Sequence, residues 1–252
     1  YVQKGDNADS KQSLGESVSI VGFNKDMSEL IYSASAGGGS KTYISRNGGE
    51  KQSLTSNISG ILTPHGTNVF YSQGGRSNYS TIYGISSFAD TYYYDGSSIY
   101  HIDGKYETRR VTSKASSPQL AKDGKTILYL KSDSLQIIDG SKDGAEPVEL
   151  VSEEVKSFIM TDNATEFYFI NTYDELYYQK GAGKPTTVSD DVYASSLYGQ
   201  SFAHYRGNKV FYISDNELYS STGGKGTLVK GIDGEISYIY SDGISAVAIS
   251  YD

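Results

Sequence analysis

Short, strongly apolar runs recur along the chain, and each carries an aromatic or β-branched side chain. The runs are hydrophobic at consecutive positions, which is typical of strands buried on both faces. No segment combines the 3.6-residue apolar period of a helix with helix caps. The six runs are Glu29-Leu30-Ile31-Tyr32, Asn68-Val69-Phe70-Tyr71, Thr126-Ile127-Leu128-Tyr129, Glu166-Phe167-Tyr168-Phe169, Lys209-Val210-Phe211-Tyr212 and Ala246-Val247-Ala248-Ile249.

Two further segments follow each run except the last, and in them apolar and polar residues alternate. Glu175-Leu176-Tyr177-Tyr178 and Pro185-Thr186-Thr187-Val188 are one such pair, separated by Gly181-Ala182-Gly183. Alternation is expected of strands with one face in water, and glycine supplies the positive φ that tight hairpins need. The chain therefore repeats a unit of several strands joined by short turns.

The spacing of the runs suggests the size of the unit. Their fourth residues are 39, 58, 40, 43 and 37 positions apart, close to the ~40–50 residues of a four-stranded propeller blade in four of five cases. Residues 236–252 supply only the first two strands of a unit, and residues 1–16 supply only the last two. Joining these halves would close a ring and leave no free sheet edge.

The sequence therefore predicts an all-β fold: a single β-propeller domain over residues 1–252, with about six four-stranded blades and one blade shared between the termini. The 58-residue interval is interpreted as one blade with an inserted hairpin at residues 79–96, and a seventh, degenerate blade is the alternative. The predicted blades are 236–252 with 1–16, 17–58, 59–116, 117–155, 156–197 and 198–235.

One stretch matches a known repeat. Residues 117–129, which read SPQLAKDGKTILY, resemble the S-P-D-G-K-x-I-A-Y signature of TolB-like, WD40-related propeller repeats. The Tyr-rich units as a whole are similar to the extracellular propeller domains of bacterial DUF5050-type surface proteins. Both resemblances rest on structural residues, so they imply the fold and carry little about function.

Charge excludes one class of partner. The chain has 22 Lys plus Arg against 30 Asp plus Glu, a formal net charge of -8, and only five Arg. Nucleic-acid binding needs a basic patch, so nucleic acid is not an expected partner.

The first residue and the lack of cysteine bear on where the protein is located. It begins at Tyr1 without a Met and holds no cysteine, which fits an exported protein whose signal or anchor has been removed. No apolar run reaches the ~18 residues of a membrane span. An extracellular or cell-surface monomer is expected, membrane-associated only through a flanking anchor.

Several catalytic and metal motifs are matched only in part. Gly124-Lys125-Thr126 lacks the earlier glycine and the helix of a P-loop, and Gly199-Gln200-Ser201-Phe202-Ala203 lacks the α/β context of a nucleophile elbow. Asp139 to Gly144 resembles a calcium loop whose final Glu is one position early, so a solvated turn is favoured. His65, His101 and His204 lie in different units. No catalytic residue, cofactor or metal ligand is predicted.

Tyrosine is the compositional feature that points to a function. The chain has 24 Tyr, and four of them, Tyr83, Tyr92, Tyr93 and Tyr94, fall in the inserted segment that the repeat does not need. Tyr is suited to stacking on sugars and to gripping peptides, so these four are the predicted partner surface. We expect a non-catalytic module that binds a protein, peptide or glycan through loops on one face. The alternative is a carbohydrate-active hydrolase with carboxylates at the channel mouth.

Overall fold

The computed structural model describes residues 13–49, 51–55, 57–63, 66–69, 85–152, 154–193, 207–230, 235–241 and 246–251. Every regular element in these residues is a β-strand, and no helix in them has the length and apolarity to cross a membrane. The chain forms two compact units, residues 1–63 with 68–115 and residues 64–67 with 116–252.

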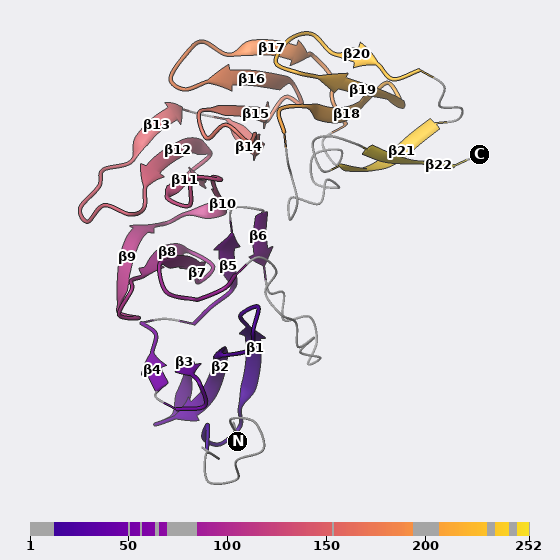
Figure 1. Ribbon diagram of the computed structural model, residues 1–252. Coiled ribbons are helices and arrows are strands. Elements are labelled where there is room, and N and C mark those ends of the chain that lie inside the picture. Colours follow the sequence, from indigo (N-terminus) through magenta and orange to yellow (C-terminus); the bar gives the residue numbers. More distant parts are fainter. Residues whose placement is uncertain are drawn as a thin grey trace. The chain divides into compact units, whose positions relative to one another are not determined.

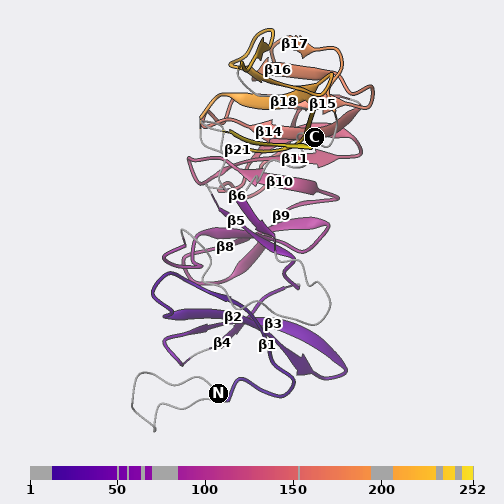
Figure 2. The same cartoon turned by 90° about the vertical axis from the view of Figure 1, so that its right-hand side faces the viewer.

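The first unit begins with a four-stranded antiparallel sheet, drawn in indigo and violet in Figures 1 and 2. Its second strand is apolar at consecutive positions and is buried on both faces, as Ile31 and Tyr32 show. The polar fourth strand lies at the edge. In order, the strands are β1 (Ser19–Phe23), β2 (Glu29–Ala36), β3 (Gly39–Arg46) and β4 (Lys51–Ser53).

The second sheet has the order β6-β5-β7-β8-β9. Its strands are β5 (Gly60–Thr63), β6 (Gly66–Val69), β7 (Thr91–Tyr94), β8 (Ser98–Ile102) and β9 (Thr108–Ser113).

This sheet corrects the predicted insertion. Residues 68–71 were expected to form the central strand and residues 79–96 an added hairpin. Instead β7 lies between β5 and β8, with Tyr93 opposite both Ile61 and Tyr100. The Thr-Tyr-Tyr-Tyr run is therefore the central apolar strand of the blade, and the extra chain lies before it.

The second unit repeats the same meander, drawn from magenta to yellow in Figure 1. Two four-stranded sheets, β10–β13 and β14–β17, are followed by a three-stranded sheet, β18–β20, and a two-stranded sheet, β21–β22, all antiparallel. The strands of the first sheet are β10 (Ser116–Leu120), β11 (Thr126–Lys131), β12 (Ser134–Asp139) and β13 (Val148–Val151). The second has β14 (Val155–Met160), β15 (Glu166–Asn171), β16 (Leu176–Lys180) and β17 (Thr186–Ser189). The last two have β18 (Val210–Ser214), β19 (Glu217–Ser221), β20 (Thr227–Leu228), β21 (Glu235–Ser241) and β22 (Ala246–Tyr251).

Within each unit, the hydrophobic core lies between consecutive sheets. Leu128 and Leu135 of one sheet pack with Phe158 and Phe167 of the next, and similar clusters join each later pair of sheets in the second unit. In the first unit, one cluster joins the β1–β4 sheet to the sheet that contains β7. Consecutive four-stranded antiparallel meanders packed face to face are the building plan of a β-propeller.

The predicted fold class is therefore confirmed: the described residues form an all-β, propeller-type fold with six sheets. Closure of the ring stays a prediction, because residues 1–12, which were expected to pair with 236–252, lie outside the described residues. The single-domain assignment also stays a prediction.

In four sheets an aromatic pair bridges the central apolar strand and the strand that follows it in the chain. Their ring centroids are 4.9 to 5.6 Å apart and the rings are stacked. The pairs are Tyr32–Tyr43, Tyr93–Tyr100, Phe169–Tyr177 and Tyr212–Tyr219. Cross-strand aromatic pairs stabilise a sheet beyond the area that they bury, and they account for much of the Tyr content.

Candidate binding site

The predicted partner surface is not supported where the structure describes it. Tyr92 and Tyr93 are 1% and 0% exposed, and the Tyr93 ring stacks on Tyr100 inside a hydrophobic cluster. Tyr94 is half-buried, and its hydroxyl donates hydrogen bonds to the carbonyl oxygens of Gly96 and Ala115. These three residues therefore have packing roles. Tyr83 lies outside the described residues.

The strongly exposed tyrosines of the described residues lie in the second unit. Tyr173 is 68% exposed and Tyr193 is 60% exposed. Tyr173 lies at the tip of the β15–β16 hairpin, where the Asn171 side-chain oxygen accepts the backbone N–H groups of Tyr173 and Glu175. This Asx-type turn fixes the backbone of the hairpin tip on which Tyr173 lies.

One backbone hydrogen bond joins the hairpin tip to the segment that follows β17, and a second joins that segment to β18. The Val192 N–H donates to the Asp174 carbonyl over 2.8 Å, and the Tyr193 N–H donates to the Ile213 carbonyl over 2.9 Å. We call residues 171–175 and 190–193, with their two exposed rings, the tyrosine edge. Its two segments hold each other in place, so both rings stand on a fixed backbone.

A polar groove of about 380 Å³ lies beside the tyrosine edge. One wall is formed by β17 and the residue after it, and the other by the β18–β20 sheet. The residues that line it with polar side chains include Ser189, Asp190, Tyr212, Ser214, Tyr219 and Lys225.

The aromatic wall of the groove is fixed in orientation. The rings of Tyr212 and Tyr219 stack with centroids 5.6 Å apart, and the Tyr219 hydroxyl donates to Glu217 Oε2 over 3.1 Å. This hydrogen bond is the main cause that raises the pKa of Tyr219, so the phenol stays neutral at physiological pH. Gly226 makes room for Tyr212, because any β-carbon there would overlap the Tyr212 hydroxyl.

Sequence reasoning missed both features for different reasons. Asn171-Thr172-Tyr173 begins a turn, and the other turns of the chain are polar. The tyrosine in this turn is therefore a local sequence signal for an exposed aromatic residue. The groove has no such local signal, because it combines residues of two sheets.

The near-matches to known motifs are turns. Asp139 Oδ1 accepts hydrogen bonds from the backbone and hydroxyl of Ser141, and its carboxylate forms an ion pair with Lys142. The segment that resembles a calcium loop is therefore a turn closed by its own residues. Asp123 caps the turn that contains Gly124-Lys125-Thr126 in the same way.

The one histidine in the described residues serves packing. The His101 ring lies 4.9 Å from that of Tyr92, and burial lowers the pKa of His101, which keeps the ring neutral. His65 and His204 lie outside the described residues, as does the Gly199 to Ala203 stretch.

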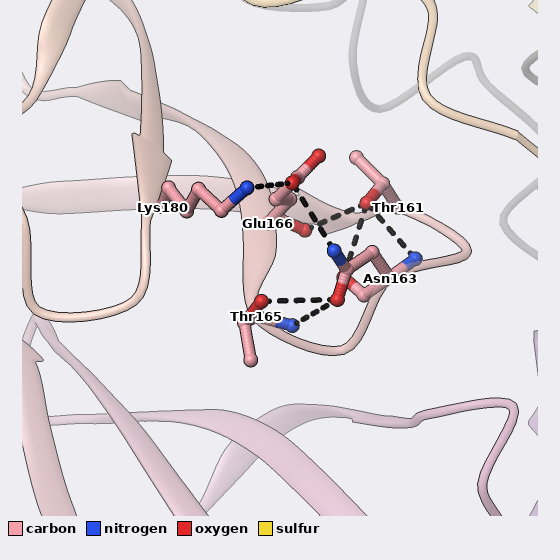
Figure 3. A network of polar contacts seen from close by, with 5 residues as sticks. All are labelled: Thr161, Asn163, Thr165, Glu166 and Lys180. Carbon is pink, nitrogen blue, oxygen red and sulfur yellow. Dashed lines mark hydrogen bonds and ion pairs between the residues drawn. The ribbon is translucent and has the colours of Figure 1, made fainter.

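Two polar networks have structural roles. In the turn between β14 and β15, Glu166 forms a 2.9 Å ion pair with Lys180, while Asn163 accepts hydrogen bonds from Thr165 (Figure 3). In the first unit, the buried Glu29 carboxylate accepts hydrogen bonds from the hydroxyls of Ser87 and Tyr106 and from the Phe88 N–H.

The carboxyl groups with perturbed pKa values all shift in one direction. Hydrogen bonds to neighbouring side chains and backbone N–H groups lower the pKa of each, outweighing burial where it acts. Ser28 is the main cause for Asp26, Ser141 for Asp139, Lys180 for Glu166 and Tyr177 for Glu175. At Asp123 burial raises the pKa, but the hydrogen bonds from Thr126 and Lys125 together lower it by more, so the net shift is downward. In the described part of the chain, no three His, Cys, Asp or Glu side chains are placed to hold a metal ion together.

No protein-family model matches the chain, and no curated protein matches its sequence. Among solved structures it is similar to Kluyveromyces lactis Hsv2, with 14% identity over 93% of this chain and 72% of that chain and a TM-score of 0.47. It is also similar to the β-propeller domain of Myceliophteria thermophila Cps50 (Swd1), with 12% identity over 95% of both chains and a TM-score of 0.44. A functionally unknown protein from Desulfotomaculum acetoxidans has 9% identity over 93% of this chain and 76% of that chain, with a TM-score of 0.39.

At these levels of similarity no residue of the known structures can be assigned a counterpart here, and the fold assignment rests on the sheets themselves. The relation to DUF5050-type domains stays a prediction.

Proposed function

We propose that this chain is a non-catalytic binding or sensor module that recognises a protein, peptide or glycan through the tyrosine edge. The observation that carries this proposal is the exposure of Tyr173 and Tyr193 on two loops that a backbone hydrogen bond, from Val192 to Asp174, joins to each other. Tyr offers a large, rigid and amphipathic contact at a low cost in conformational entropy. Loops held on a rigid scaffold are the usual position of recognition residues.

Preorganisation supports the same proposal. The Lys156 ammonium binds the Asp174 carboxylate over 2.8 Å, and the Tyr173 hydroxyl donates to Glu154 over 3.2 Å. The edge is therefore ordered before a partner arrives, and little further entropy is lost on binding.

Five carboxyl groups of the described residues are unsuited to the acid role in glycoside hydrolysis. A glycoside hydrolase needs one carboxyl group that stays protonated at its working pH, which requires a raised pKa. The shifts described above are all downward, so Asp26, Asp123, Asp139, Glu166 and Glu175 are ionised at neutral pH and cannot act as the acid.

The location outside the cell belongs to the proposal as well. A Tyr-rich chain without cysteine agrees with a surface-displayed protein. We propose that the module works as a monomer, anchored through flanking sequence if it is attached to a membrane.

The test is a binding screen of the parent and of a double variant on glycan, peptide and protein arrays. Tyr173→Ala with Tyr193→Ala should weaken binding at least about tenfold, as for exposed aromatic hot spots, with an unchanged unfolding midpoint. Met27→Ala with Val148→Ala, which removes exposed apolar side chains elsewhere, is the matched control and should bind like the parent. Binding that survives the double tyrosine variant, or no binding by the parent on any array, would contradict the proposal.

A further inference from the structure

We propose that the groove beside the tyrosine edge holds a neutral saccharide unit. This inference rests on the proposed binding function and assigns its ligand class. It follows from the donors, acceptors and aromatic surface that line the groove.

The polar groups of the groove match a ligand made of hydroxyls. The Asp190 carboxylate can only accept hydrogen bonds, the Lys225 ammonium can only donate them, and the Ser214 hydroxyl can do both. A sugar hydroxyl both donates and accepts, so it can bridge such groups in turn. A charged carboxylate or ammonium also makes a stronger hydrogen bond than a neutral group does.

The aromatic wall provides the second half of sugar recognition. The Tyr219 ring is half-buried, backed by Tyr212 and tethered through its hydroxyl to Glu217. A fixed ring of this kind presents an apolar face against which the C–H groups of a pyranose can pack, next to polar groups that bind its hydroxyls.

Other ligand classes fit the groove less well. An apolar ligand would meet the Tyr219 ring and the buried Val188 but would leave the polar groups of the lining, such as Asp190 and Lys225, without partners. A phosphate group would meet one lysine whose charge is balanced by Asp190, in a chain with a net charge of -8. The groove volume is within the lower part of the ~300–1,000 Å³ range of small-ligand sites.

The groove and the tyrosine edge share one residue, Asp190. Asp190 lines the groove, and three residues later Tyr193 is exposed beside the hairpin tip.

The test uses saturation-transfer NMR and calorimetric titration with glucose, galactose, N-acetylglucosamine and their disaccharides. The parent should bind at least one of these probes saturably. Asp190→Asn and Tyr219→Ala should each weaken that binding at least about tenfold. Tyr177→Ala is the matched control, because Tyr177 follows the same Glu-Leu pair in the preceding sheet and also donates to its Glu; it should bind like the parent.

Two results would overturn the inference: no probe binding by the parent, or binding that both Asp190→Asn and Tyr219→Ala leave unchanged. If Tyr219→Ala fails to fold, the exposed Asp190 decides alone. Array binding that depends on Tyr173 and Tyr193 without any saccharide binding would leave the proposed function intact and reject the saccharide assignment. Failure of both screens would reject both.

Discussion

At the scale of single residues, the tyrosines divide into rings that hold sheets together and rings that face water. Tyr93 is fully buried and stacks on Tyr100, whereas Tyr173 is 68% exposed at a hairpin tip. Both are counted in the same high Tyr content, so composition alone does not separate them. The register does: Tyr93 has a cross-strand neighbour on each side, and Tyr173 lies in a turn.

Truncation of Tyr93 tests this division. Tyr93→Ala should lower the free energy of unfolding by roughly 3–5 kcal/mol, because it empties a fully buried aromatic site. Tyr173→Ala should change it by less than about 0.5 kcal/mol, as is usual for a surface substitution. Urea unfolding measures both values. Equal losses of stability in the two variants would contradict the assignment of Tyr93 to the core and of Tyr173 to the surface.

Tyr32 gives a second prediction from the residue scale. Its hydroxyl is buried and makes no hydrogen bond within the described part of the chain, whereas the Tyr168 hydroxyl donates to the carbonyls of Asn208 and Ser221. A buried polar group without a partner costs free energy, so Tyr32→Phe should leave stability unchanged or raise it by up to about 1 kcal/mol. Tyr168→Phe should destabilise by about 1 kcal/mol. The interpretation is wrong if thermal and urea unfolding show the same loss for both variants.

At the scale of elements, the hairpins are held by short-range caps from Asp and Asn. Asp26, Asp123 and Asp139 each accept hydrogen bonds from residues two or three positions later, and Asn163 does the same in the β14–β15 turn. The acidic composition of the chain is thus partly a consequence of its many turns. Local side-chain capping of this kind is why Asp, Asn and Gly mark turns in a sequence.

These caps make stability depend on pH. The pKa values of Asp26, Asp123 and Asp139 are lower in the folded protein than the ordinary value of about 3.9. The stabilisation is therefore fully present above pH ~4 and is lost as the pH falls through the folded values. Urea unfolding between pH 7 and pH 2 should show this loss. Asp123→Asn, which preserves the cap as Asn163 does, should make the loss smaller, and an unchanged acid slope would contradict the assignment.

Most of the elements could be predicted from sequence because their signals are local. Leu30 to Tyr32 and Ile127 to Tyr129 are apolar at consecutive positions and follow an Asp-capped turn, and both lie in central strands. The second blade was misassigned because residues 68–71 and 91–94 satisfy the same pattern. Only pairing with Ile61 and Tyr100, which is long-range, shows which of the two is central.

The binding site could not be predicted for the same physical reason. The groove depends on β17 packing beside the Tyr212–Tyr219 pair and on a glycine at position 226 that admits the Tyr212 ring. These contacts join residues well separated along the chain, and periodicity carries no information about them.

At the scale of the whole molecule, a repeated tetrapeptide bears on ring closure. Lys-Gln-Ser-Leu occurs at residues 11–14 and again at 51–54. Residues 51–53 form β4, the outer strand of its sheet, and Leu54 is buried in the core beyond it. Leu14 is likewise buried, against Leu30 and Tyr32 of β2. The likeness supports the prediction that residues 11–13 are the outer strand of a preceding blade.

The last strand favours the same conclusion. Ala246 and Ala248 pack against the β18–β20 sheet, whereas Val247 and Ile249, on the opposite face of β22, are 65% and 37% exposed. An apolar face of this kind at the end of a repeat is expected to be covered by a neighbouring element. In a closed ring the next blade would cover this face, and we predict that residues 1–4 pair with the edge of β22 to complete the shared blade.

Cysteine crosslinking tests ring closure most directly, because the chain has no native cysteine. Gln3→Cys is combined in turn with Val247→Cys, Ala248→Cys and Ile249→Cys, and disulfide formation under mild oxidation is followed by mass spectrometry. Strands in a sheet lie ~4.8 Å apart, within disulfide reach, so at least one pair should link inside a single molecule. Gln3→Cys with Ser141→Cys, which the predicted ring places in different blades, should stay reduced. A folded protein in which none of the three pairs links would contradict a propeller closed by its two ends.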